Sequence, residues 1–143
     1  MRTGVILASH GEFARAALGS AEMVAGPQPD ICALALQADT SLEDFEAAFR
    51  DAYDQLSSQC DLVVCLCDIL GGTPFNVVAR VKAAGLELLA YTGLSMPVLL
   101  ELLITRGQYS TEWELANVIE AAGASALQRI DMAPVPTEDG EDL

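Results

Sequence analysis

Short runs of apolar residues alternate along this chain with longer stretches in which apolar residues recur at helical spacing. Four runs have the length and composition of buried strands, at residues 3–9, 31–36, 62–67 and 86–91. The stretches between them place apolar residues three or four positions apart, which is typical of amphipathic helices. The pattern therefore predicts strands that alternate with helices.

Residues that favour helix ends mark the boundaries of these helices. Ser41 and Thr111 each precede an acidic residue by three positions, which is the spacing of a capping box. Thr73 followed by Pro74 predicts another helix start, with a hydroxyl cap and a proline at the first helical position. The predicted helices cover residues 13–24, 41–56, 74–84, 95–106 and 111–122.

Strands that are apolar throughout, each followed by a helix, predict a single doubly wound α/β domain with a mostly parallel sheet flanked by helices. For a chain of 143 residues we expect the flavodoxin-like strand order, in which the first and third strands are neighbours. A short apolar stretch at residues 126–130 predicts a last strand at the sheet edge. The domain is expected over residues 1–132, and the acidic tail, residues 133–143, is expected to be disordered.

The composition disfavours several classes of function. The chain has 7 Lys and Arg against 21 Asp and Glu, and the net charge of -14 disfavours nucleic acid and anionic membrane surfaces as partners. No uncharged apolar run reaches the roughly 18 residues of a membrane span, and the chain does not start with a signal-peptide pattern. We therefore expect a cytoplasmic protein without direct membrane insertion.

The four cysteines are expected to be reduced and mostly buried, and their spacing predicts no metal site.

His10 is the only histidine, and it stands where the first predicted strand ends. An imidazole can act as a base, an acid or a nucleophile near neutral pH. Ligands of open α/β sheets bind beyond the carboxyl ends of the strands, where the strand order reverses. The flavodoxin-like order brings His10 beside Asp68, which follows the third strand. Asp68 is expected to accept a hydrogen bond from Nδ1–H and to leave Nε2 as the nucleophile; taken singly, both residues are also typical of structural turns.

Glycines beside both residues indicate an anion site. Gly71, Gly72 and Thr73 follow the aspartate and open a helix, and Gly11 follows the histidine before another helix. The free N–H groups of helix amino ends bind anions, so the arrangement fits a transferred phosphoryl group. Neither a P-loop nor a G-x-G-x-x-G fingerprint is present, so no nucleotide cofactor is expected and another phosphorylated protein is the expected donor.

At these residues the chain resembles the mannose-type (mannose/fructose/sorbose) enzyme IIA component of the bacterial phosphoenolpyruvate-dependent sugar phosphotransferase system. The resemblance covers about residues 3–130. It rests on residues 4–11, 21–23 and 92–101, and most specifically on Asp-Ile-Leu-Gly-Gly-Thr-Pro-Phe-Asn at 68–76.

The resemblance implies a phosphoryl relay that passes through a phosphohistidine. His10 matches the histidine that accepts a phosphoryl group from the phosphocarrier protein HPr and passes it to a IIB component, which phosphorylates the incoming sugar. Asp68 matches the carboxylate that bonds to that histidine. The resemblance also implies a homodimer that exchanges a carboxyl-terminal strand, for which residues 126–130 are the candidate.

Other functions stay open on the sequence alone. The phosphotransfer subunit that serves dihydroxyacetone kinase has a similar first strand and histidine but lacks the Gly-Gly-Thr-Pro-Phe-Asn pattern. A regulatory protein whose phosphorylation state is read by another protein would use the same histidine. A flavodoxin-like domain that binds a small ligand without chemistry would not need it. The identity of the sugar is not encoded in a phosphoryl site.

Overall fold

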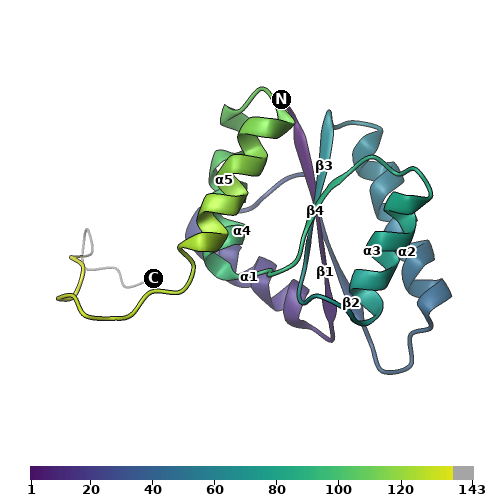
Figure 1. Cartoon of the computed structure of the whole chain (residues 1–143), viewed down its shortest axis with the longest axis horizontal. Helices are drawn as coiled ribbons and strands as arrows, with labels where there is room; N and C mark the ends of the chain where they lie inside the picture. The colour runs from purple at the N-terminus through teal and green to yellow at the C-terminus, as the bar shows by residue number, and fades with distance from the viewer. Residues whose placement is uncertain (137–143) are drawn as a thin grey trace.

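Strands and helices alternate in the computed structural model of this chain, which describes residues 1–136 (Figure 1). The strands are β1 (Thr3–His10), β2 (Ile31–Leu36), β3 (Leu62–Cys67) and β4 (Leu89–Tyr91). The helices are α1 (Phe13–Ala25), α2 (Leu42–Ser57), α3 (Gly72–Ala83), α4 (Met96–Thr105) and α5 (Glu112–Ala124), with the short 3-10 helix η1 (Arg106–Gln108) before the last.

The four strands form one parallel sheet in the order β2-β1-β3-β4. The chain runs from β1 outward to β2 and then returns to the other side of β1 as β3. This order confirms the predicted flavodoxin-like arrangement, with the first and third strands as neighbours. Ala8 lies opposite Cys67 in the register of these two strands. The carboxyl ends of the strands therefore lie at one edge of the sheet, with His10 as the last residue of β1 and Asp68 directly after β3.

Helices cover both faces of the sheet, as Figure 1 shows with the sheet seen nearly edge-on between them. The helices α1, α4 and α5 cover one face, where Val5 and Leu7 of β1 pack with Leu99 and Leu102 of α4. The helices α2 and α3 cover the other, where the alternate β1 residues meet apolar side chains such as Phe49. Phe49 is fully buried, and burying such a side chain stabilises a fold by about 1.5–3 kcal/mol.

Hydroxyl caps form at three helix starts. Ser41 accepts a hydrogen bond from the Asp44 amide at 3.0 Å, and Thr111 accepts one from the Glu114 amide at 3.2 Å, as their spacing predicted. Ser95 does the same at the start of α4.

The predicted cap at Thr73 is wrong. The helix α3 begins at Gly72 with Gly71 as its N-cap, so Thr73 lies inside the first turn and makes no capping bond. Gly71 and Gly72 have φ angles of +81° and +82°, a conformation that glycine adopts without the strain that a side chain would bring. These two residues turn the chain sharply enough for the helix to start before Thr73.

The last part of the sheet also differs from the prediction. The strand β4 has three residues and begins at Leu89 rather than Leu86. Leu86 instead completes the end of α3, because its amide donates to Val81 O while the Gly85 amide donates to Lys82 O. This pair of bonds is a Schellman motif, and it satisfies carbonyls that the helix end would otherwise leave free.

Residues 126–130 form no strand in this chain. Leu127 is 95% exposed and Ile130 is 87% exposed, and the segment leads away from the domain (Figure 1). Apolar residues favour a strand only where a sheet edge is within reach, and this segment does not reach one within its own chain. Of the predicted tail, residues 133–136 are exposed without regular structure, and residues 137–143 lie outside the described residues.

No helix in the described part of the chain is long and apolar enough to cross a membrane.

Candidate functional site

The ends of β1 and β3 bring His10 and Asp68 into contact. His10 Nδ1 lies 2.7 Å from Asp68 Oδ2, and the backbone amide of His10 donates to the same oxygen at 2.9 Å. The other carboxylate oxygen, Oδ1, accepts from the Ile69 amide at 2.9 Å. These bonds hold the carboxylate in one orientation beside the imidazole, as the strand order predicted.

The electrostatics of Asp68 determine which nitrogen of the imidazole is free. Partial burial by itself would raise the pKa of the Asp68 carboxyl, but hydrogen bonds from the backbone and ring of His10 and from Ile69 outweigh it, and this pKa lies below its ordinary value. The carboxylate is therefore ionised at neutral pH and can only accept hydrogen bonds. Nδ1 of His10 must carry the proton of the 2.7 Å bond, which leaves the lone pair of the neutral ring on Nε2.

The free side of the ring packs against Gly72 at the start of α3. A Cβ placed on Gly72 would lie 2.9 Å from His10 Cε1 and 3.0 Å from His10 Nε2. Only a residue without a side chain fits there, so the backbone of α3 comes directly beside the nitrogen that holds the lone pair. The His10 side chain is still 48% exposed, against 12% for Asp68, so a partner can reach the ring.

The two helices that follow the site strands β1 and β3 lack the hydroxyl caps of the other three. Gly71, the N-cap of α3, has no side chain, and Glu12, the N-cap of α1, makes no capping bond. Ser9 within β1 takes one α1 amide, that of Ala14, at 2.7 Å. The start of a helix carries free N–H groups and a partial positive charge, so the start of α3 beside Nε2 suits an anion. Gly11 lies at the turn between His10 and α1 with φ +54°.

No cationic side chain pairs with this site. All seven Lys and Arg residues lie in the described part of the chain, and none has an ion pair or hydrogen bond with His10 or Asp68. Arg15, near the start of α1, bonds to Glu12 instead. The positively polarised groups beside His10 and Asp68 are therefore the backbone amides at the helix starts.

A comparison with protein families identifies the family to which this chain belongs. The family model described as "PTS system fructose IIA component" matches residues 4–119, which include both strands that carry the site. This chain belongs to that IIA family. It is accordingly a component of sugar phosphotransfer.

Relatives of known description agree with this family. The fructose-specific EIIA component of Bacillus subtilis is 27% identical over 87% of this chain and 84% of that protein. The mannose-specific EIIAB component of Escherichia coli is 24% identical over 94% of this chain, which spans 42% of that longer protein. Among solved structures, the mannose/sorbose-specific IIA subunit of Enterococcus faecalis superposes with a TM-score of 0.81 at 26% identity, covering 95% of this chain and 100% of that one.

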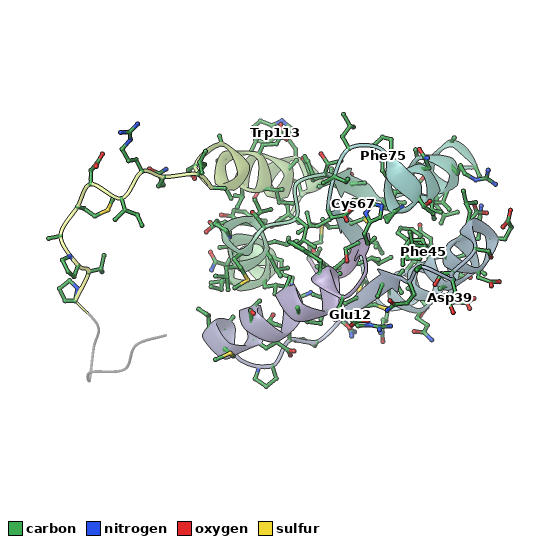
Figure 2. The ribbon with its side chains drawn as sticks, turned by 90° about the horizontal axis from the view of Figure 1, so that it is seen from below. Glu12, Asp39, Phe45, Cys67, Phe75 and Trp113 are labelled. Carbon is green, nitrogen blue, oxygen red and sulfur yellow. The ribbon has the colours of Figure 1, made fainter. Side chains whose placement is uncertain are left out.

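Two features of this IIA site escaped sequence reasoning. The Cys67 thiol lies 3.7 Å from Asp68 Oδ1, whereas the sequence suggested only a buried apolar role for it. The one available signal was that Cys67 directly precedes Asp68. Ile69 and Leu70, which follow Asp68, are 56% and 77% exposed and place apolar surface next to the histidine. Figure 2 looks onto this edge of the sheet, with Cys67 labelled near its centre.

Proposed function

We propose that this IIA component is a phosphoryl carrier, in which His10 accepts a phosphoryl group from phospho-HPr and passes it to a IIB component for sugar uptake. The observation that carries the proposal is the 2.7 Å bond between His10 Nδ1 and Asp68 Oδ2, which leaves Nε2 free beside the start of α3. The family match supports the same reaction class. The cytoplasmic location expected from the sequence belongs to this proposal.

The transfer needs a nucleophile, a charge partner and an anion cradle. Nε2 attacks the phosphorus of phospho-HPr, the bond between phosphorus and the donor nitrogen breaks, and that electron pair stays on the donor. The His10 ring gains positive character, which the Asp68 carboxylate stabilises through Nδ1–H. The phosphoryl oxygens face backbone amides of Gly71, Gly72 and Thr73 and the turn at Gly11. The second transfer, to IIB, repeats these steps with His10 as the donor.

Both partners must reach the same imidazole, and the exposed apolar residues around it suit that task. Phe13, Ile69 and Leu70 are each about half exposed or more, and they flank the histidine at the starts of α1 and α3. An apolar rim lets two different proteins dock by contact area rather than by one set of charge pairs.

Labelling tests the proposed function directly. With enzyme I, HPr and labelled phosphoenolpyruvate, the chain should take up close to one phosphoryl group per molecule. The label should be acid-labile, as a phosphohistidine is. Trypsin cleaves after Arg2 and Arg15, so the label should lie on the peptide of residues 3–15, which holds the only histidine.

The donor reaction supplies its own control, because HPr is labelled in the same tube. A chain that stays unlabelled while HPr is phosphorylated is not a carrier, and this result would favour a domain that binds a ligand without chemistry. An acid-stable label, or one outside residues 3–15, would likewise exclude His10.

The free edge of β4 supports the homodimer as part of the proposal. Within residues 1–136, β4 pairs only with β3, and the exposed residues 126–130 leave the domain as an apolar segment. A second copy that adds this segment to the free edge of β4 would pair its backbone groups. Light scattering should give a mass of about twice 15.1 kDa, and removal of residues 126–143 should give the monomer mass. A full-length chain of monomer mass at micromolar concentration would refute the exchange.

A further inference from the structure

The carboxylate of Asp68 accepts four hydrogen bonds. Oδ2 takes the His10 amide and Nδ1 at 2.9 and 2.7 Å, and Oδ1 takes the Ile69 amide at 2.9 Å and the Cys67 thiol at 3.7 Å. An ionised carboxylate has about four acceptor positions, so this set fills them. Three of the donors belong to the backbone or to the reacting ring. Within residues 1–136, the thiol of Cys67 is the only donor from any other side chain.

The thiol keeps its proton and is held in place. Cys67 is only 2% exposed, and burial together with the neighbouring Asp68 charge raises the pKa of this thiol to about 12. The S–H group is therefore a donor throughout the physiological pH range. Its other acceptor within reach, Ile69 O, lies farther away at 4.0 Å. In the view of Figure 2 the Cys67 label lies between those of Glu12, the N-cap of α1, and Phe75 of α3, at the edge where the site forms.

We propose that Cys67 is a positioning residue for the reaction at His10, because its thiol donates the fourth hydrogen bond to the Asp68 carboxylate. Without this donor, Oδ1 keeps only the Ile69 amide, and the carboxylate gains freedom to turn away from Nδ1. The carboxylate also becomes more basic, because a hydrogen bond to the charged form favours that form. Both changes weaken the control that Asp68 exerts on His10.

Few other groups act on this carboxylate. Among the described residues, His10 of β1 and Cys67 of β3 are the only titratable side chains in hydrogen-bonding contact with Asp68. The β4–α4 loop contributes only the Gly93 amide, which binds the Asp68 backbone carbonyl, and α3 contributes no charged contact. Burial also acts on the pKa of Asp68, so Cys67→Ser, which keeps a donor at this position, is needed to separate the loss of the donor from a change in burial.

The test compares Cys67→Val with Cys65→Val, which is a closely matched control. Cys65 lies two positions earlier on the same face of β3, is fully buried and makes no hydrogen bond with Asp68. Side-chain carbon NMR should show the pKa of Asp68 raised by about half a unit in Cys67→Val and unchanged in Cys65→Val, since a weak donor to a charged group is lost. Cys67→Ser, which restores a donor, should return the pKa to the wild-type value or below it. Cys67→Ala serves if valine prevents folding.

The measurement of phosphorylation rates rests on the proposed function, whereas the NMR measurement of the Asp68 pKa does not. Phosphorylation by phospho-HPr should slow about fivefold in Cys67→Val, with recovery in Cys67→Ser, and the pH profile of the rate should shift with Asp68. Equal pKa values for Asp68 in Cys67→Val and Cys65→Val would overturn the inference even if labelling succeeds. A wild-type chain that is never labelled would overturn the proposed function, and the NMR comparison would still decide the role of Cys67.

Discussion

Replacing Gly72 by alanine is expected to slow phosphorylation of His10 by about 100-fold, the scale of loss when a reacting group is displaced by about 1 Å. The new Cβ would lie 2.9 Å from His10 Cε1, closer than real Cβ contacts come, and 3.0 Å from His10 Nε2, which is also unusually tight. Either the ring or the start of α3 must move, and each movement separates the nucleophile from the amides beside it. The initial rate of label transfer from phospho-HPr at fixed concentrations measures the effect.

Gly71→Ala is the matched control for this substitution. Gly71 has nearly the same φ, +81° against +82°, so alanine is strained at both positions, by about 1–3 kcal/mol at each. A Cβ on Gly71 would meet nothing within 4 Å. Both variants should therefore lose stability in urea, while Gly71→Ala, which keeps its backbone amide and adds no contact with the ring, should lose clearly less rate than Gly72→Ala. Equal losses of rate in both variants would show that backbone strain, and not contact with the ring, limits the reaction.

Asp68→Asn should also lower the phosphorylation rate about 100-fold, which corresponds to about 2.7 kcal/mol. The carboxylate accepts N–H bonds on both oxygens, from His10 on one side and from Ile69 on the other. An amide has one oxygen and one NH2 group, so its NH2 must face one of these donors whichever way it is turned. The ring loses its negative partner as well. Single-turnover transfer from phospho-HPr gives the rate.

Asp61→Asn is the control, because Asp61 precedes β3 at the opposite end of the sheet and accepts one backbone bond, from Arg2. The phosphorylation rate of Asp61→Asn should match that of the wild type.

The stability of Asp68→Asn gives a second, independent measurement. The pKa of folded Asp68 lies below its unfolded value, so the ionised carboxylate stabilises the fold at neutral pH, and this contribution is lost as pH falls through the folded pKa. The gap in unfolding free energy between wild type and Asp68→Asn should narrow on acidification. An unchanged rate in Asp68→Asn would contradict the proposed pairing.

The sheet was predictable from sequence where burial dictates composition. The strands β1 and β3 lie between two layers of helices, so both of their faces are apolar. Each strand therefore stands out in the sequence as an uninterrupted run of apolar residues. The edge strand β4 was less predictable, because Leu86 is apolar like a strand residue but completes the Schellman motif of α3. Residues 126–130 show the same limit, since an apolar run does not specify the sheet edge with which it pairs.

The site was predictable as far as strand order determines it. Knowing that β1 and β3 are neighbours is enough to bring His10 and Asp68 together. The contact between Gly72 and the imidazole depends on two left-handed glycines in succession, and the pattern Thr-Pro pointed to a later helix start. The bond from Cys67 depends on a side-chain direction at the last residue of β3, which no periodicity encodes.

The lack of a cationic partner at this site bears on the energetics of the proposed relay. A fixed guanidinium or ammonium beside a bound phosphoryl group would hold it tightly and make its onward transfer unfavourable. Helix amino ends supply only about half a positive charge, spread over several amides. A phosphoryl group on His10 would thus keep much of the transfer potential that it had on the donor. The transfer from HPr to His10 and the transfer from His10 to IIB would both lie close to equilibrium. The fraction of phosphorylated chain would then follow the balance between the supply of phosphoryl groups from HPr and their consumption in sugar uptake.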